Sequence, residues 1–300
     1  MYIGDERNLE KPMSQEKNKV LGSTLYLVGT PIGNLADMSE RAKKVLSEVD
    51  FVAAEDTRNS MKLLSLFDIK KEMVSYHEHN KKASGERVVA RLIAGESCAL
   101  ITDAGMPAIS DPGEDLVRLC AEAGVTVSVV PGPSAVVSAL ALSALSTVRF
   151  AFEGFLPPQK NERKKRLDAV KYDDRTLVFY EAPHKLKATL ADMAEVFGAD
   201  RKISLCRELT KLNEETMRLT LGEAVDYYDK NEPRGEYVLV LSGYDGIVPA
   251  SNEEDFLLLS PEDHVAKYEA EGMKRMDAIK KAAKDRGVSK SELYKLLLEE

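Results

Sequence analysis

Short apolar runs alternate with amphipathic stretches from Thr24 onward. Runs of four to six apolar residues bounded by Gly, Pro or Asp predict strands. In the first half of the chain the predicted strands are Leu25–Val28, Phe51–Ala54, Ala99–Thr102 and Val125–Val130. The predicted helices between them are about Asp37–Val49, Ser84–Ile93 and a helix that begins within Asp111–Glu114, with Pro112 in its first turn and Gly124 at its end. This alternation is typical of parallel α/β units.

A second set of strands and helices follows. The predicted strands are Phe150–Phe152, Thr176–Tyr180, Lys202–Cys206 and Tyr237–Leu241, with a strand or a helix near Arg218. A basic helix after Glu153–Pro157 and a helix over about His184–Phe197 lie between them. The stretch Ala135–Leu145 is so apolar that we expect a fully buried helix there. The sequence therefore predicts an α/β protein with two lobes and a cleft.

These patterns divide the chain into segments. We expect a disordered N-terminal tail over residues 1–22, an N-terminal α/β domain over 23–146 and a C-terminal α/β domain over 147–244. Residues 245–254 lack periodicity and predict a linker. Residues 255–300 predict a small helical extension of the helix-turn-helix type, with Ser289–Glu292 starting a helix before Leu293.

Composition limits the classes of protein that the chain can represent. The net charge of −8 argues against a protein that coats nucleic acid nonspecifically, although Lys160–Arg166 and Lys274–Lys290 are locally basic. Such runs are also typical of solvated helix faces. The three cysteines form no CxxC pair and indicate a reduced, cytoplasmic location. No apolar stretch approaches the roughly 20 residues that span a bilayer.

The unusual segments follow the predicted strands. In the first half they are Gly29–Asn34, Glu55–Arg58, Asp103–Pro107 and Pro131–Ala135, and in the second half Glu153–Pro157, Tyr180–Lys185 and Cys206–Lys211. Ligands of parallel sheets bind beyond the carboxyl ends of the strands, so these loops predict one pocket. Neither GxGxxG nor a P-loop occurs, which argues against a dinucleotide fold of that type and against a P-loop nucleotidase.

Several of these side chains have two interpretations. Asp103 suits a ligand amino or hydroxyl group, or caps its own loop, and Ser134 suits a ligand or caps the following helix. Glu55, Asp56 and Arg58 suit a reactive site or an ion pair that locks a loop.

The motifs in this order resemble one family closely. They are LYLVGTPIGNLADMSERA, AEDTR, ITDAGMPAISDPG, VVPGPSA, FEGFLP, YEAPHKL and CRELTK, spread over residues 24–243. They resemble the 16S rRNA cytidine 2′-O-methyltransferases, a family of the tetrapyrrole methylase superfamily. The resemblance implies a homodimer that moves a methyl group from S-adenosylmethionine to the ribose 2′-hydroxyl of a cytidine in the decoding region of 16S rRNA. The partner would be this RNA within a small ribosomal subunit or its precursor.

The resemblance also implies roles for residues of these motifs. Cofactor contacts are expected from Pro31, Asp103, Gly105, Met106, Ser134, Ala135, Phe155, Ala182 and Leu209. RNA contacts are expected from Arg58, His184, Lys185 and Arg207. A positioned base accelerates attack by a hydroxyl about 10² to 10⁴-fold. Glu181 is the first candidate for this base and Glu55 or Asp56 the second, and no metal is implied.

Two other functions remain open at this point. A methyltransferase of precorrin-type tetrapyrroles would share the fold and the cofactor, but AEDTR and YEAPHK disfavour it. A non-enzymatic RNA-binding assembly factor would use the basic tail and keep only a vestigial pocket.

Overall fold

The computed structural model describes residues 19–246, 259–270 and 272–297. Two compact units divide the chain, one over Met1–Tyr244 and one over Asp245–Glu300, and each is described by itself. Residues 1–18 of the predicted N-terminal tail and 247–254 of the predicted linker lie outside the described residues. The predicted domain boundary near Ser146 therefore concerns lobes within the first unit.

The first lobe is built on a five-stranded sheet in the order β3-β2-β4-β1-β5. Its strands are β1 (Thr24–Val28), β2 (Phe51–Ala54), β3 (Glu72–Ser75), β4 (Ser97–Ile101) and β5 (Thr126–Val130). All neighbouring strands are parallel, as the alternating pattern predicts. Every residue of β2 and β4 is buried, because a parallel sheet is covered on both faces.

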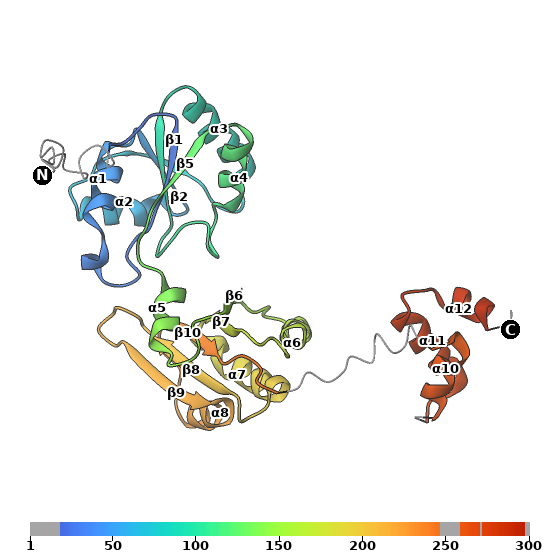
Figure 1. Cartoon of the computed structure of the whole chain (residues 1–300). Coiled ribbons are helices and arrows are strands. Elements are labelled where there is room, and N and C mark those ends of the chain that lie inside the picture. The colour runs from blue at the N-terminus through green and yellow to red at the C-terminus, as the bar shows by residue number, and fades with distance from the viewer. Residues whose placement is uncertain (1–18, 247–258, 271, 298–300) are drawn as a thin grey trace, which may run out of the picture. The chain divides into compact units, whose positions relative to one another are not determined.

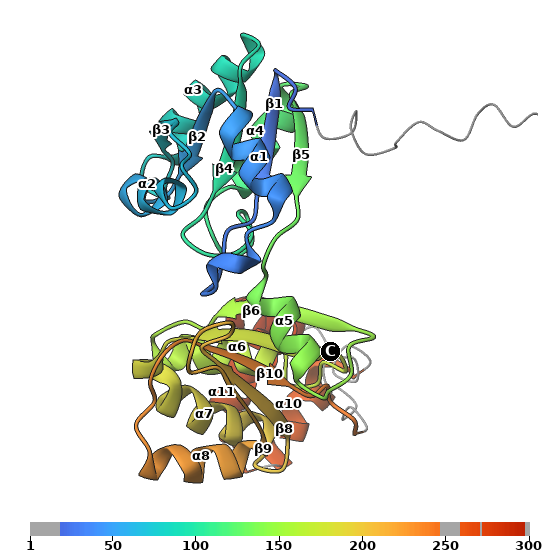
Figure 2. The same ribbon diagram turned by 90° about the vertical axis from the view of Figure 1, so that its left-hand side faces the viewer.

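Helices cover both faces of this sheet (Figures 1 and 2). They are α1 (Glu40–Glu48), α2 (Thr57–Ser65), α3 (Lys81–Ile93) and α4 (Glu114–Glu122), with a 3₁₀ turn η1 at Leu35–Asp37. Side chains of α1 and α2 share one core with the sheet, and those of α3 and α4 share the other.

One predicted helix start is wrong and another holds within its range. The helix expected from about Asp37 begins at Glu40, because the Ser39 side chain accepts a hydrogen bond from the Ala42 N–H and caps it. The helix expected to begin within Asp111–Glu114 begins at Glu114, but Pro112 precedes it and does not lie in its first turn. Gly124 ends it in a left-handed conformation, as expected.

The second lobe contains a mixed sheet in the order β6-β7-β10-β8-β9. Its strands are β6 (Phe150–Phe155), β7 (Thr176–Glu181), β8 (Lys202–Arg207), β9 (Glu215–Thr220) and β10 (Tyr237–Leu241). Only β6 and β7 are parallel neighbours, so the expectation of parallel units fails for the rest of this sheet. Strands β7 and β8 are both antiparallel to β10, and their carboxyl ends therefore lie at the same edge.

One face of the second sheet packs on α6 (Lys160–Ala169), α7 (Pro183–Phe197) and α8 (Leu221–Lys230). The opposite face packs on α5 (Ala135–Leu142), although this helix precedes the predicted boundary. The burial expected for this helix holds on one side only. Ala139 is fully buried, whereas Val137 keeps 58% of its surface exposed. The helix therefore presents a second apolar side that the described residues do not cover.

The second unit contains α10 (Pro261–Ala270), α11 (Arg275–Asp285) and α12 (Lys290–Leu296). These helices enclose a small core around Val265, Ile279 and Leu293. A capping box of Ser289 and Glu292 starts α12, as predicted. In the part of the chain that the structure describes, we find no helix with the length and apolar character needed to cross a membrane.

Candidate functional site

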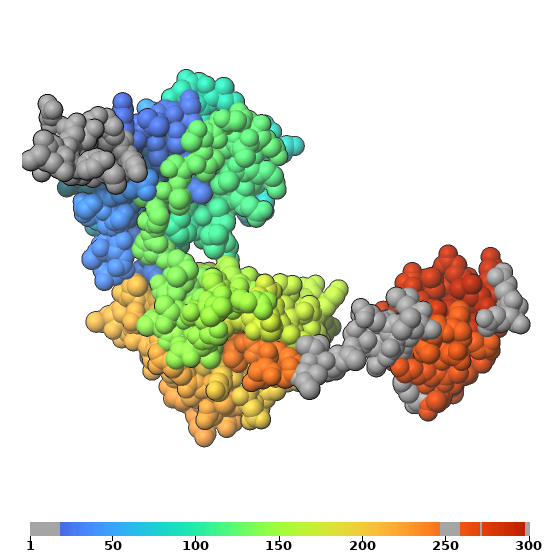
Figure 3. Space-filling view, in the orientation of Figure 1, coloured from blue at the N-terminus to red at the C-terminus, as the bar shows by residue number. Residues whose placement is uncertain are grey.

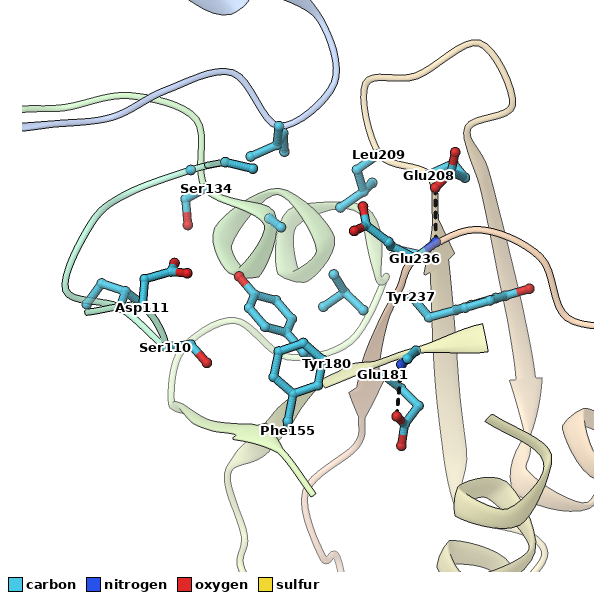
Figure 4. A pocket seen from close by; sticks show the side chains of 18 of the residues that line it. Ser110, Asp111, Ser134, Phe155, Tyr180, Glu181, Glu208, Leu209, Glu236 and Tyr237 are labelled. Carbon is cyan, nitrogen blue, oxygen red and sulfur yellow. Dashed lines mark hydrogen bonds between the residues drawn. The ribbon is translucent and has the colours of Figure 1, made fainter. Parts of the chain in front are cut away.

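Loops of both lobes surround a cavity of about 440 Å³ (Figure 4). The first lobe contributes the loops after β1, β4 and β5, and the second lobe contributes the ends of β6, β7 and β8 and the start of β10. Most of the cofactor residues expected from the sequence line it, namely Gly105, Met106, Ser134, Ala135, Phe155, Ala182 and Leu209. The strand-end argument thus brings together loops that are far apart in the sequence.

Backbone contacts connect the loops that form the first-lobe wall of the cavity. The loops after β1 and β5 approach so closely that a Cβ atom on Gly132 would lie 2.8 Å from the Cα of Gly29. The Thr30 N–H donates to the Gly105 carbonyl at 2.9 Å, and the Gly105 N–H donates back at 3.1 Å. Glycine at these positions allows contacts that a side chain would block.

The second-lobe wall is largely apolar and aromatic. The rings of Phe152 and Phe155 pack edge-on against Tyr180, with centroid distances of 4.9 and 5.4 Å. Burial raises the pKa of the Tyr180 phenol to about 12, and the nearby Asp111 charge adds to this effect. Tyr180 is therefore a neutral hydroxyl at pH 7. Leu209 and Val238 add further apolar side chains to this wall of the cavity.

Asp111 is a cavity residue that sequence reasoning missed as a functional group. Figure 4 shows its carboxylate directed into the cavity from the first lobe. Burial raises its pKa to about 6, the charges of Glu55 and Asp103 raise it further, and the Thr102 hydroxyl opposes the shift. The sequence pattern places Asp111 only at a helix start. A carboxylate in a segment that follows a strand of a parallel sheet is also typical of a ligand site.

Ser134 does not cap α5, since its side chain makes no capping hydrogen bond. Figure 4 shows the hydroxyl on the cavity side of the loop. Of the two interpretations of Ser134, this geometry favours ligand contact.

The geometry of Glu181 contradicts the prediction that it is the general base. One carboxylate oxygen accepts a hydrogen bond from the Ala182 N–H at 2.8 Å, and the other accepts one from the Thr189 hydroxyl at 2.5 Å. The side chain is 4% exposed and points away from the cavity toward α7 (Figure 4). Its two oxygens are thus engaged at the start of that helix, and only its main chain borders the cavity.

Asp56 is likewise occupied in holding local structure. Its carboxylate caps α2 by accepting hydrogen bonds from the Arg58 and Asn59 N–H groups, and its oxygen lies 3.6 Å from the Arg58 Nε. These interactions, the Arg58 N–H first, lower the pKa of Asp56. The loop-locking interpretation of this pair therefore fits the structure better than a base at Asp56. Glu55 is exposed and lines a neighbouring hollow together with Asp111.

The remaining predicted residues lie at or beyond the rim. Pro31 is buried outside the cavity lining, and Asp103 is exposed and accepts a hydrogen bond from the Asn59 amide at 3.3 Å. His184 lines the cavity, whereas Lys185 does not. Arg207 pairs with Glu215 at 3.2 Å in a separate small hollow. Arg58 is 84% exposed on α2.

The second-lobe rim carries a charged cluster that the sequence did not indicate. The Lys211 ammonium contacts Glu208 at 2.9 Å and Glu236 at 2.8 Å, and all of these residues line the cavity. The Glu236 N–H and Lys211 hold the pKa of Glu208 below its usual range. Carboxylates of this kind accept hydrogen bonds from ligand hydroxyl or amino groups.

Taken together, the lining combines an apolar and aromatic surface with a few polar groups at the rim. Cavities of this size and composition are typical of sites for small organic ligands. Among the residues that the structure describes, no group of His, Cys, Asp and Glu is arranged to hold a metal ion.

Comparison with known families gives one extended match. The family model described as Tetrapyrrole (Corrin/Porphyrin) Methylases matches residues 24–225. This range contains all the strands of both sheets except β10, and all the loops that line the cavity except the one before β10.

Curated relatives cover nearly the whole chain. The chain is 48% identical over 277 residues to "Ribosomal RNA small subunit methyltransferase I" of Halalkalibacterium halodurans, covering 92% of this chain and 95% of the relative. It is 44% identical to the protein of the same name from Bacillus subtilis, covering 95% and 97%. The protein of that name from Escherichia coli O157:H7 is 42% identical, with 92% and 95% covered.

Solved structures share the fold at lower identity. A uroporphyrin-III C-methyl transferase from Thermus thermophilus complexed with S-adenyl homocysteine gives a TM-score of 0.52 at 18% identity, covering 73% of this chain and 97% of that chain. A diphthine synthase gives a TM-score of 0.55 at 14% identity, covering 73% and 89%. These likenesses show the fold alone.

Proposed function

Since the chain belongs to the ribosomal RNA small subunit methyltransferase I family of the tetrapyrrole methylases, we propose that it transfers a methyl group from S-adenosylmethionine to small-subunit ribosomal RNA. The observation that carries this proposal is the cavity. Six of the seven loops identified from the sequence contribute residues to its lining, and the lining suits a nucleoside with a polar tail. Relatives of that name match over more than nine-tenths of the chain.

The lining fits S-adenosylmethionine in its chemistry. A flat ring suits the apolar surface of Phe155, Ala182 and Leu209, and ribose hydroxyls suit carboxylate acceptors at the rim. The cofactor, when bound, supplies a methyl group on a positively charged sulfur. The chain's own task is then to orient the acceptor oxygen toward that methyl group and to exclude water, and well-oriented reactants reach effective molarities of about 10⁵ to 10⁸ M.

For the acceptor we propose the ribose 2′-hydroxyl of a cytidine in the decoding region of 16S rRNA, within a small subunit or its precursor. Arg58, Lys185 and Arg207 would contact this RNA from outside the cofactor cavity, and His184 would contact it from the cavity lining. The Arg58 side chain is 84% exposed, so RNA can reach it although its Nε lies 3.6 Å from Asp56. The basic surface of α11 adds exposed Lys280, Lys281 and Lys284 as groups that suit backbone phosphates.

We further propose a cytoplasmic homodimer. The first unit exposes apolar side chains at Val137 and Leu142 of α5 and at Val148 and Phe150 near β6. In Figure 3 the green chain around α5 lies on the surface of the view shown. Exposed apolar surface of this kind is typical of an interface, and a second copy of the chain is the occupant we propose.

The two alternatives are less well supported. A precorrin-type methyltransferase rests on structures that are 16–21% identical, whereas relatives named for ribosomal RNA are 42% or more identical. An assembly factor without activity would not require a cavity lined by seven of the predicted cofactor residues.

The test uses purified full-length protein with radioactive S-adenosylmethionine and small subunits from a strain that lacks the corresponding methyltransferase. We expect one modified cytidine, mapped by nuclease digestion, and far slower transfer to a short oligonucleotide. A porphyrinoid that changes its absorbance on binding and accepts the methyl group would instead support the tetrapyrrole alternative.

A matched pair of variants tests whether the cofactor binds in this cavity. Ala182→Trp fills space at the lining and should weaken cofactor binding by at least tenfold in calorimetry, because the indole occupies the ligand volume. Ala191→Trp changes an exposed position of the same helix and should bind as the wild type does. Equal binding by the two variants would contradict this assignment of the cavity.

A further inference from the structure

The carboxylates that line the cavity differ in what already occupies them. Glu181 is turned to Thr189, and Glu208 and Glu236 are both held by Lys211. Asp111 makes no ion pair with any residue that the structure describes, and its oxygens face the cavity (Figure 4). It is therefore the lining carboxylate that a substrate group can reach without breaking an ion pair.

Asp111 also lies where two hollows meet. Together with Ser110 it lines both the 440 Å³ cavity and a neighbouring hollow of about 460 Å³. A group that receives a proton from an acceptor hydroxyl must contact that oxygen while the oxygen faces the methyl donor. Asp111 meets this requirement because it borders both spaces. A methyl donor in the cavity and an acceptor hydroxyl in the neighbouring hollow would reach it from different sides.

The loop that carries Asp111 is held in an unusual backbone conformation. Ala108 and Ser110 have φ angles of 66° and 65°, and Gly113 has a φ of 143°. Non-glycine residues in this region cost on the order of 1 kcal/mol or more and persist where surrounding structure enforces them. The conformation turns the Asp111 side chain toward the cavity opposite the Tyr180 hydroxyl, as Figure 4 shows.

Several charged groups face Asp111. Glu55 and Asp103 act on it from the ends of β2 and β4, and Tyr180 faces it from β7. The shared hollow adds charged side chains of both signs, which are Glu78, Lys81, Glu114, Asp115 and Arg118. Burial, and after it the charges of Glu55 and Asp103, make Asp111 a stronger proton acceptor than an exposed aspartate while leaving it mostly ionised at pH 7.

We propose that Asp111 is a catalytic residue that accepts the proton of the attacking ribose hydroxyl. The inference rests on the proposed methyl transfer. As the hydroxyl oxygen bonds to the methyl carbon, the carbon–sulfur bond breaks and its electron pair stays on sulfur, while the O–H proton passes to an Asp111 oxygen. Tyr180, neutral at this pH, donates a hydrogen bond rather than accepting the proton.

The experiment compares Asp111→Asn and Asp111→Glu with the wild type in single-turnover methylation of unmodified small subunits. We expect Asp111→Asn to bind S-adenosylmethionine within about twofold of the wild type in calorimetry and to transfer methyl about 10² to 10⁴-fold more slowly. Asp111→Glu should recover part of the rate. Glu122→Gln, at the exposed end of α4, is the control and should leave the rate unchanged.

The pH profile separates a proton acceptor from a structural side chain. The wild-type rate should rise tenfold per pH unit below about pH 6 and level off above it, and the Asn variant should lose this limb. An Asn variant within threefold of the wild-type rate, or an Asn variant that keeps the limb, would overturn the inference. Should Asp111→Asn fail to fold, a wild-type rate that is flat between pH 5 and 8 would also overturn it. A wild type that binds no cofactor would instead overturn the proposed function.

Discussion

The two walls of the cavity are stabilised differently. In the first lobe the wall is a set of loops with left-handed residues at Ala108 and Ser110 and a carboxylate, Asp111, whose burial opposes its charge. In the second lobe the wall is mostly aromatic and apolar, and its carboxylates already have partners: Glu181 accepts from Thr189, and Glu208 and Glu236 pair with Lys211. Left-handed backbone occurs in this wall too, at Glu208, so the walls differ in the state of their carboxylates and not in backbone strain.

This difference assigns separate tasks to the walls. Perturbed carboxylates and unusual backbone angles concentrate at positions that perform chemistry, and the surrounding fold must stabilise them. A largely apolar wall whose carboxylates are already paired contributes binding surface instead. The second lobe, with its large core around Phe179 and Leu239, then provides stability that the loops of the first lobe do not.

The largest expected effect comes from a substitution that lowers the stability of the second lobe. Arg163 on α6 and Asp192 on α7 form a buried pair, with contacts of 2.6 and 2.8 Å and side chains only 8% and 6% exposed. Arg163→Ala leaves a buried carboxylate with only Lys160 at 3.9 Å, and the expected loss of unfolding free energy is about 3–5 kcal/mol. The chain has no tryptophan, so circular dichroism in urea is the measurement.

Lys164→Ala is the matched control for Arg163→Ala. It removes the neighbouring, partly exposed pair with Glu195, and such pairs contribute about 1 kcal/mol or less. Comparable losses in the two variants would show that the buried pair does not support the second lobe as argued.

Much of the fold follows from the apolar pattern alone. The strands Phe51–Ala54 and Tyr237–Leu241 have the predicted bounds because each is a continuous apolar run between turn residues. The pattern did not predict β3, in which Val74 is the one buried residue of four. It also did not predict α2, because Asp56, which caps this helix, was interpreted only through its charge. The mixed direction of the second sheet depends on pairing with β10, and no local pattern encodes it.

For the site, the sequence predicts which loops meet but not the direction of each side chain in them. Strand-end loops meet for topological reasons, so Gly105, Ser134 and Leu209 reach one cavity. The direction of Glu181 depends on Thr189, eight residues along a buried helix, and the charge of Asp111 depends on burial by both lobes. Such properties arise from tertiary contacts, which the linear pattern does not contain.

A second prediction sharpens the contrast by asking whether the reactive wall reduces stability. The folded-state pKa of Asp111 is raised from 3.8 to about 6, so the folded protein binds this proton more tightly than the unfolded chain. Stability therefore falls as the pH rises from about 4 to about 6 and stays lower above that range. Asp111→Asn removes this cost. At pH 8 the free energy of unfolding of this variant, measured in urea, should exceed that of the wild type by about 1–2 kcal/mol after allowance for the partial exposure of residue 111.

The comparison at pH 4 is the internal control for this stability effect. The folded wild type is then protonated at residue 111, and most of the gain should disappear. A variant that is less stable than the wild type at pH 8 would mean that the Asp111 carboxylate has favourable contacts that outweigh its burial.

The smallest expected effect tests the apolar wall. Phe155 packs on Tyr180 at 5.4 Å, yet 58% of it is exposed, so its ring is available to a ligand and contributes little to the core. Phe155→Ala should weaken S-adenosylmethionine binding about fivefold, equivalent to about 1 kcal/mol of lost aromatic contact, with the unfolding midpoint nearly unchanged. Leu212→Ala, at a residue 98% exposed and outside the lining, is the control for calorimetry. If Phe155→Ala slowed methyl transfer at saturating cofactor without changing affinity, the second wall would take part in the chemistry, and the separation of tasks between the walls would be wrong.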